Sequence, residues 1–303
     1  MNAITLDGRV DALLAGAIDL HCHTGPSIMK RKLDHLDQIE DAERAGLRAV
    51  LFKDHFYADT GVLDVIRKHR PGGSGLLLLS GVPLNNALGG FNPHAVRHGL
   101  GRGARLVWMP TLCACNHLSS AFRYDLAGRL GMVRPKGLTA LDTRGRVVDE
   151  LKEIFDIIAE HDAVLCGGHL HATEMFPLFE EAIRRGVRRM LVSHPTFWIE
   201  ADVQDLRDLA AMGVFLEHVA CLTIDCADRL YTAEDLRTFI EAGGIDMTIL
   251  SSDLGQPQNP RPVEGFRAVI ALCIEAGFGD DDIRKLTSGN AARLLGLDGE
   301  PAP

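Results

Sequence analysis

The segment Ile18-Asp19-Leu20-His21-Cys22-His23-Thr24 ends an apolar stretch with two histidines one residue apart. In a β-strand alternate side chains share a face, so His21 and His23 should point the same way. Two neutral imidazoles directed at one point form half of a metal site. We therefore expect the rest of the chain to build a fold that brings further ligands to this pair.

Composition narrows the class of protein. The chain has 303 residues, 46% hydrophobic and 24% charged, which suits one large domain rather than a disordered segment. Its net charge of −9 argues against a nucleic-acid partner. Seven cysteines, an odd number, do not suggest a secreted disulfide framework, and no signal peptide or membrane-spanning run is evident. We expect a cytoplasmic protein that acts on a small molecule.

Short apolar segments recur along the chain and are predicted to be strands. There are eight of them: Ala17–His21, Ala49–Lys53, Leu76–Val82, Arg105–Pro110, Ala163–His169, Arg189–His194, Val214–His218 and Thr248–Asp253.

Helical periodicity separates these strands, with apolar residues recurring at intervals of three and four. The predicted helices are Leu36–Ala45, Val62–Lys68, Pro93–Leu100, Glu150–Glu160, Glu174–Arg185, Val203–Ala211, Ala233–Glu241 and Val263–Ala276. Alternation of this kind favours a single α/β domain over residues 1–303, folded as a (β/α)8 TIM barrel. No Gly-rich phosphate loop follows the first strand, so a nucleotide-binding sheet is disfavoured. A barrel of this type carries its chemistry at the C-terminal ends of the strands.

One connection is much longer than the others. Residues 111–149 separate the fourth and fifth strands, contain several apolar residues and include a predicted hairpin about Arg144-Gly145. Loops of this length usually have a function. We interpret the insertion as a lid, with a contact in a homo-oligomer as the alternative. Arg123, Arg134 and Lys136 within it are candidates to bind a carboxylate or phosphate of the substrate.

Ionisable residues gather where the predicted strands end. Six of the eight strands finish on a histidine, a carboxylate or a lysine. Any one of these could be an ordinary polar cap, but barrel geometry brings all of the strand ends to one mouth. The residues in question are His21, His23, Lys53, His55, His169, His171, His194, Glu217, His218 and Asp253.

Strand alternation also gives Lys53 a direction. Val50 and Phe52 form the outward set, which turns Lys53 and His55 inward. A bare ammonium repels a metal ion, whereas a carboxylated lysine can bridge two cations. The alternative interpretation of Lys53 is a buried ion-pair partner of a nearby aspartate.

The ordered pattern resembles the amidohydrolase superfamily of metal-dependent hydrolases. The resemblance rests on His21-Cys22-His23, on His169, on His194 in Val192-Ser193-His194-Pro195, and on Asp253 in Ser251-Ser252-Asp253. The segment Thr287–Leu297 resembles the C-terminal helix of many members, and we expect a closing helix over residues 283–297.

The resemblance implies two divalent metal ions, of zinc, iron or manganese. One would be held by His21, His23 and Asp253, and the other by His169 and His194. Asp253 would also take the proton of the attacking water. The fourth strand lacks the lysine or glutamate that usually bridges the ions, so Lys53, Glu217 or Lys136 supplies the bridge, or the site holds one metal.

The chemistry expected of this set is hydrolysis of an acyl bond in an amide, lactone, ester or thioester by metal-activated water. His171, His218 and His55 are left as candidates to stabilise the oxyanion or assist the leaving group, or to orient a ligand. Three alternatives remain open. They are phosphoester hydrolysis on a histidine-rich barrel, decarboxylation on one metal, and a binding protein that has kept the barrel and its metal.

Overall fold

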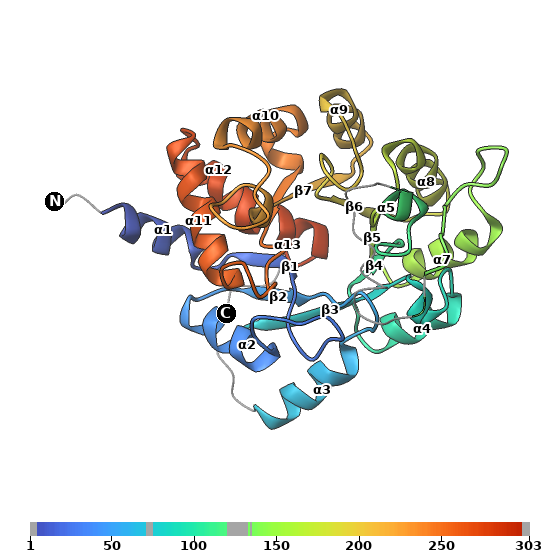
Figure 1. Cartoon of the computed structure of the whole chain (residues 1–303), viewed down its shortest axis with the longest axis horizontal. Coiled ribbons are helices and arrows are strands. Elements are labelled where there is room, and N and C mark those ends of the chain that lie inside the picture. Colours follow the sequence, from blue (N-terminus) through green and yellow to red (C-terminus); the bar gives the residue numbers. More distant parts are fainter. Residues whose placement is uncertain (1–4, 71–74, 120–132, 134, 299–303) are drawn as a thin grey trace. The chain divides into compact units, whose positions relative to one another are not determined.

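The computed structural model describes residues 5–70, 75–119, 133 and 135–298. Arg123 and Arg134, the two arginines predicted to contact substrate, lie outside these residues, as does much of the predicted lid. Within the described part the alternation of strands and helices follows the sequence prediction closely (Figure 1).

Eight strands form one sheet, in which each strand neighbours the next along the chain. The fold class is the (β/α)8 barrel that the sequence predicts, and every predicted strand is present to within a few residues. The strands are β1 (Ile18–Cys22), β2 (Ala49–Phe52), β3 (Leu77–Pro83), β4 (Leu106–Trp108), β5 (Val164–Cys166), β6 (Arg189–Ser193), β7 (Phe215–Val219) and β8 (Thr248–Ser251).

A helix follows each strand, and the eight predicted helices are all found. They are α2 (His35–Arg44), α3 (Thr60–His69), α4 (Pro93–Gly101), α7 (Asp149–Glu160), α8 (Ala172–Arg184), α9 (Val203–Ala211), α10 (Ala233–Gly243) and α11 (Pro262–Glu275). α1 (Leu6–Leu14) and α5 (Cys115–Ser119) were not predicted from the sequence. Three short 3₁₀ turns are η1 (Asn86–Leu88), η2 (Ala220–Leu222) and η3 (Ile245–Met247).

Contacts within the chain divide it into two compact units. The first unit comprises residues 1–53, 63–79 and 217–303, and the second comprises residues 54–62 and 80–216. Three of the four divisions fall within α3, β3 and β7, and the fourth falls between β2 and α3.

In the first unit β1 lies between β2 and the end of β8. β1 and β2 are parallel, with a shift in register between Asp19 and Cys22. On the other side of β1, the Asp253 N–H donates to the His21 carbonyl (2.7 Å), and the His23 N–H donates to the Leu254 carbonyl (2.8 Å). The residue that follows the last strand is thereby placed next to the first strand.

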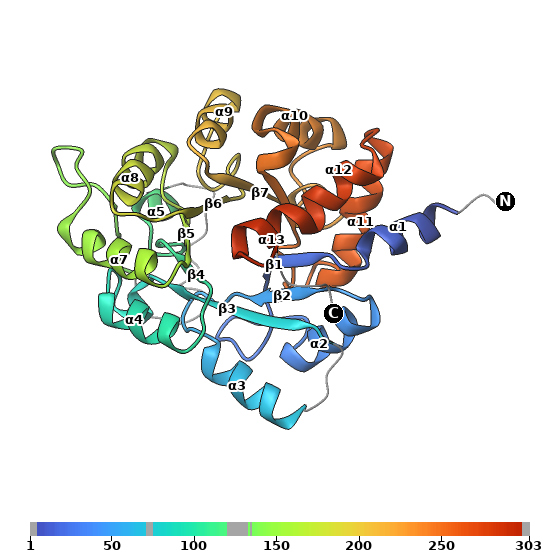
Figure 2. The ribbon, with the colours of Figure 1, turned by 180° about the vertical axis from the view of Figure 1, so that it is seen from behind.

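The closing segment secures the opposite end of these strands. The predicted single helix over 283–297 is divided into α12 (Asp280–Arg284), a π-helical turn over Lys285–Gly289 and α13 (Asn290–Leu295). The Thr287 hydroxyl donates to the Ile283 carbonyl, a bond that locally distorts a helix. Asn290 Nδ2 donates to the Ile245 and Thr248 carbonyls (2.6 Å each). α13 lies beside β1 in both ribbon views (Figures 1 and 2).

In the second unit β3 to β6 form a regular parallel ladder. Its pairs include Val82 with Val107 and Leu106 with Val164. The predicted hairpin about Arg144-Gly145 is confirmed by an antiparallel bridge between Leu141 and Val147. The hairpin is held against α8, because the Ala140 N–H donates to the Glu174 carboxylate (2.8 Å).

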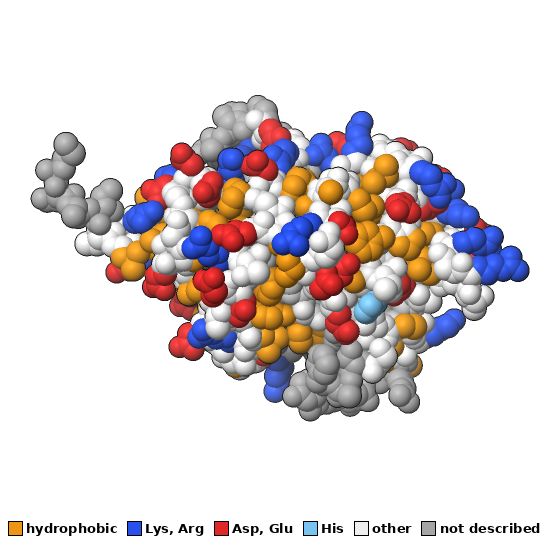
Figure 3. Space-filling model, turned by 90° about the horizontal axis from the view of Figure 1, so that it is seen from above, with side chains coloured by type: hydrophobic (Ala, Val, Ile, Leu, Met, Phe, Trp, Pro, Cys, Tyr) orange, Lys and Arg blue, Asp and Glu red, His pale blue; other side chains and the backbone are white. Residues whose placement is uncertain are grey.

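Acidic and basic side chains are interspersed with apolar ones over the face of the molecule drawn in Figure 3. Among the residues that the structure describes, none of the helices combines the length and the apolar character that a bilayer crossing demands.

Candidate metal centre

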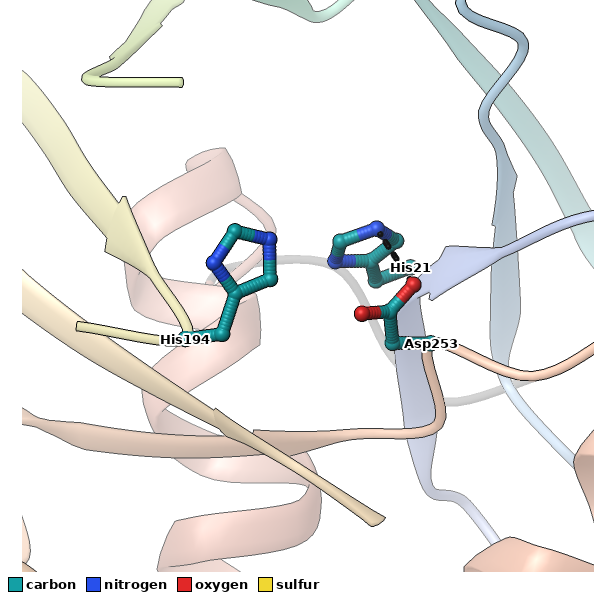
Figure 4. A group of neighbouring side chains, drawn as sticks. All are labelled: His21, His194 and Asp253. Atoms are coloured by element: carbon teal, nitrogen blue, oxygen red, sulfur yellow. Dashed lines mark ion pairs between the residues drawn. The ribbon is translucent and has the colours of Figure 1, made fainter. Parts of the chain in front are cut away.

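The two histidines of β1 meet the aspartate that follows β8. Asp253 Oδ1 lies 3.1 Å from His21 Nε2 and 3.0 Å from His23 Nε2, and all three side chains are buried. Figure 4 shows the contact between His21 and Asp253, which come from the ends of β1 and β8. Both belong to a group of side chains close enough to ligate one metal ion. We call His21, His23 and Asp253 the carboxylate site.

The backbone around Asp253 is specialised for this contact. Asp253 has a φ of +49°, in the left-handed region that aspartate tolerates better than most residues. Gly255, two residues later, has a φ of +128°, and a Cβ at that position would overlap the His23 carbonyl. The turn after β8 therefore requires glycine in order to pass so close to β1.

Both histidines of the carboxylate site use Nδ1 to contact an oxygen acceptor. His21 Nδ1 lies 3.2 Å from Glu217 Oε2, and His23 Nδ1 lies 2.8 Å from the Lys53 carbonyl. Arg31 Nη2 also lies 3.3 Å from His23 Nδ1, but the shorter contact with a carbonyl, which can only accept, assigns the proton to Nδ1. The Nε2 lone pairs then face Asp253, as in metal-binding histidines.

This arrangement fits a cation. The Nε2 lone pairs of His21 and His23 lie 3.0–3.1 Å from Asp253 Oδ1. All three atoms are acceptors and would repel one another without a positive charge among them. A proton on one imidazole, the Lys53 ammonium, whose Nζ lies 3.0 Å from His21 Nε2, or a metal ion can supply that charge. Ligand atoms bound to one tetrahedral zinc ion are separated by roughly 3.3 Å, close to the distances seen here.

The electrostatics agree with a site that attracts positive charge. Burial raises the pKa of the Asp253 carboxyl, but the neighbouring His21 and His23 together outweigh it, and the pKa lies well below its usual value. Burial disfavours the protonated form of His21, but Asp253 and Glu217 together outweigh it and raise the pKa of that imidazole. Burial and the Arg31 guanidinium lower the pKa of His23 to about 3, so this ring is neutral.

Lys53 points toward the carboxylate site, in the direction that strand alternation predicts. Its Nζ lies 3.0 Å from His21 Nε2. The outward direction of Phe52 is also confirmed, because its ring stacks on His35 of α2 with centroids 4.5 Å apart.

The two candidates on β7 point in opposite directions. Glu217 contacts His21 Nδ1, so it orients a candidate ligand. His218 stacks on Phe239 of α10 with ring centroids 5.7 Å apart, and burial lowers its pKa to about 4. Strand alternation therefore directs His218 toward the helix layer and away from His21.

The second unit contains a group of packed imidazole and indole rings. His169 and His194, which follow β5 and β6, have ring centroids 4.9 Å apart, and Figure 4 also draws His194. The Trp198 ring is stacked on His169, 4.9 Å away and nearly parallel, with an interplanar angle of 3°. We call His55, His117, His169, His194 and Trp198 the imidazole cluster.

His117, which lies on α5 near the start of the insertion, was not among the residues predicted from the sequence. Its Nδ1 is 3.0 Å from His169 Nδ1, and its ring centroid is 4.8 Å from that of Trp198. The preceding residue, Asn116, donates through Nδ2 to the carbonyls of His169 (3.1 Å) and Trp198 (2.8 Å). The only signal in the sequence was a polar pair among the apolar residues that open the insertion.

The end of β4 presents a hydroxyl where the resemblance expects a lysine or glutamate. Thr111 Oγ1 lies 2.9 Å from His55 Nδ1 and accepts from Asn85 Nδ2 at 2.6 Å. The same Asn85 Nδ2 donates to the His55 carbonyl (3.0 Å). Thr111 and Asn85 thus orient His55 within the second unit.

Two other candidates have structural contacts. His171 is the N-cap of α8 and accepts from the Thr173 N–H at 3.2 Å, with its side chain 37% exposed. Lys136 is exposed, and its backbone N–H donates to Asn86 Oδ1 at 2.7 Å.

Comparison with protein families identifies the chain. Residues 16–217 match a family described as a family of unknown function, DUF6282. The chain belongs to DUF6282. No curated protein matches this DUF6282 chain in sequence.

Solved structures share the fold of this DUF6282 chain. An amidohydrolase from Pseudomonas aeruginosa is similar with a TM-score of 0.66 and 13% identity, over 95% of this chain and 98% of the other. The probable dipeptidase PvdM from the same organism has a TM-score of 0.67 and 13% identity over 97% and 98% of the chains. A 2,6-dihydroxybenzoate decarboxylase from Rhizobium has a TM-score of 0.53 and 13% identity over 94% and 100%. The predicted resemblance to the amidohydrolases is confirmed in the fold.

Proposed function

We propose that this DUF6282 protein is a metal-dependent hydrolase that cleaves an acyl bond of a small molecule. The observation that carries the proposal is the convergence of His21 Nε2, His23 Nε2 and Asp253 Oδ1, because this set of acceptors calls for a cation. The names of the amidohydrolase and the probable dipeptidase with the same fold support hydrolysis as the reaction class.

The carboxylate site is the proposed position of a first divalent ion. Such an ion lowers the pKa of a coordinated water toward about 7 and polarises the carbonyl that it touches. Asp253 accepts the proton of the attacking water and passes it to the leaving group. Its Oδ2 accepts a weak hydrogen bond from the Cys221 thiol at 3.6 Å, which fixes the orientation of the carboxylate.

His169 and His194 are the proposed ligands of a second ion, on the basis of their order in the sequence. Lys53 is the proposed shared ligand, because its Nζ approaches His21 Nε2 to 3.0 Å. Reaction of the neutral amine with carbon dioxide would form a carbamate N–C bond and release a proton, replacing a repelling ammonium by an anion. Glu217 and His55 are proposed to orient ligands rather than bind metal.

A second candidate is decarboxylation on one ion. It is favoured by Thr111 at the end of β4, where a hydroxyl stands in place of a bridging lysine or glutamate, and by the decarboxylase of the same fold. A single ion without a bridge would suffice for that reaction.

The test is a substrate screen on protein reconstituted separately with Zn²⁺, Fe²⁺ and Mn²⁺. The panel holds dipeptides, lactones, esters, thioesters and aromatic acids. We expect hydrolysis of at least one acyl substrate, lost on chelation and in Asp253→Asn. Evolution of carbon dioxide without hydrolysis would favour the second candidate, and turnover that survives complete chelation would contradict both.

A further inference from the structure

We propose that His117 is a positioning residue that sets the tautomer of His169. This inference rests on the proposed role of His169 as a metal ligand. It assigns a function to the first helix of the insertion, α5, which the sequence suggested only as part of a lid.

The contact between the two rings leaves room for one proton. His117 Nδ1 and His169 Nδ1 are 3.0 Å apart, and both side chains are 3% exposed. At that distance one nitrogen donates and the other accepts. If His117 donated, neutral His169 would carry its own proton on Nε2 and could not bind a metal through that atom. If His169 donates, its Nε2 lone pair is free.

The carboxylate site indicates which assignment holds. His21 and His23 both direct Nδ1 to an acceptor, Glu217 Oε2 and the Lys53 carbonyl respectively, and keep Nε2 for the cation. Metal-binding histidines generally follow this rule, and their outer partners affect metal affinity strongly. For His169, the group in the same position is His117 Nδ1.

Neighbouring contacts hold the pair of rings in place. Trp198 packs against both, with centroids 4.8 Å from His117 and 4.9 Å from His169. Asn116 Nδ2 bridges the carbonyls of His169 and Trp198. The loops that follow β5 and β6 are thus joined to α5 at two successive residues. Such a rigid arrangement suits a residue that orients a ligand.

Three substitutions separate positioning from packing. His117→Phe keeps a ring against Trp198 but removes the acceptor, whereas His117→Asn places an amide oxygen near the position of Nδ1. His161→Phe is the matched control, since His161 is another histidine of the second unit and contacts the Ile157 carbonyl through Nδ1. A further variant, His169→Ala, removes the proposed ligand and so shows which equivalent of bound metal depends on His169.

The first measurement is titration with Co²⁺, followed by its visible absorption. One equivalent of Co²⁺ should no longer bind in His169→Ala. We expect the affinity for that equivalent to be about 10- to 100-fold weaker in His117→Phe than in the wild type. His117→Asn should restore affinity to near that of the wild type, and His161→Phe should not change it. Wild-type affinity in His117→Phe would overturn the proposal and leave the ligand assignment intact. If His169→Ala binds all the metal that the wild type binds, the ligand assignment fails and the proposal fails with it.

The second measurement uses metal-free protein and therefore does not depend on the proposed function. Nitrogen-15 shifts of the imidazoles report which ring nitrogen carries the proton. We expect His169 to be protonated on Nδ1 in the wild type and in His117→Asn, with a shift toward the Nε2–H form in His117→Phe. A predominant Nε2–H form in the wild type would overturn the proposal. Should His117→Phe fail to fold, His117→Ala, which also lacks an acceptor, replaces it in both measurements.

Discussion

The carboxylate site and the imidazole cluster differ in the groups that each would offer to a cation. In the first, a buried carboxylate with a strongly lowered pKa faces two imidazole lone pairs. In the second, the described rings are imidazoles and an indole, packed about His169 and Trp198 at centroid distances of 4.8–6.4 Å. Negative charge should make the carboxylate site the tighter of the two. Aromatic packing gives the cluster geometric precision instead.

The largest expected effect comes from neutralising that charge. Asp253→Asn keeps the size of the side chain, and asparagine tolerates the positive φ at this position, so folding should be retained. We expect loss of the metal of the carboxylate site and a fall in kcat of about 10²- to 10⁴-fold. Metal analysis and steady-state kinetics measure the two effects.

The matched control is Asp246→Asn, which removes an exposed carboxylate that pairs with Lys285 at 2.8 Å. It should leave both metal content and kcat unchanged. Full metal occupancy in Asp253→Asn would show that charge is not what distinguishes the two regions.

Gly255→Ala tests the backbone of the carboxylate site alone. A methyl group at Gly255 would overlap the His23 carbonyl, whereas a methyl group at Gly277, which also has a positive φ, would meet nothing within 4 Å. Gly277→Ala should cost roughly 1–2 kcal/mol of unfolding free energy, and Gly255→Ala about twice that. Denaturant titration measures both. Equal costs would mean that the close approach does not constrain the turn.

His218 extends the comparison to a buried imidazole that has no metal role in our account. Burial lowers its pKa to about 4, below its value in the unfolded chain. Between pH 6.5 and pH 4 the unfolded state therefore binds a proton that the folded state does not, and stability falls as the pH falls. The loss is about 3 kcal/mol at most. In His218→Phe, which retains a ring against Phe239, this part of the acid dependence should disappear.

Denaturant titrations at several pH values compare His218→Phe with wild type. The control is His98→Phe, a substitution of an exposed histidine on α4. Identical pH profiles for His218→Phe and wild type would show that His218 is not titrating in this range.

The smallest expected effect is at Glu217, the partner of His21 Nδ1. Glu217→Gln keeps an acceptor oxygen but removes its charge. We expect metal affinity at the carboxylate site to fall about 10-fold, the lower end for an outer partner. Isothermal titration with Zn²⁺ would check this, and an unchanged affinity would contradict the role of Glu217 as the partner that orients His21.

Much of the carboxylate site could be predicted from the sequence, because strand alternation has a fixed period. The spacing of His21 and His23 predicted one shared face, and the convergence of strand ends in a barrel, together with the family resemblance, predicted that Asp253 would meet them. Both are seen in the contacts at 3.0–3.1 Å. The same period, applied to adjacent residues of β7, explains why Glu217 contacts His21 and His218 does not.

The imidazole cluster was harder to predict, because its contacts depend on loops. His117 lies in an insertion without a repeating pattern, and its partner His169 is distant in the sequence. In a continuing strand His171 would share a face with His169, two residues earlier, but the chain has left the strand by then, and His171 caps α8 instead. Alternation ceases to be a guide where the strand ends.

The most direct test of our account is the metal content of the purified protein, compared between wild type and His23→Ala. We predict at least one equivalent of a divalent transition metal in the wild type and the loss of one equivalent in His23→Ala, with the far-ultraviolet circular dichroism of the two proteins unchanged. Wild-type protein that remains without metal after dialysis against Zn²⁺, Fe²⁺ and Mn²⁺, or a His23→Ala variant that retains full occupancy, would contradict the assignment of the carboxylate site.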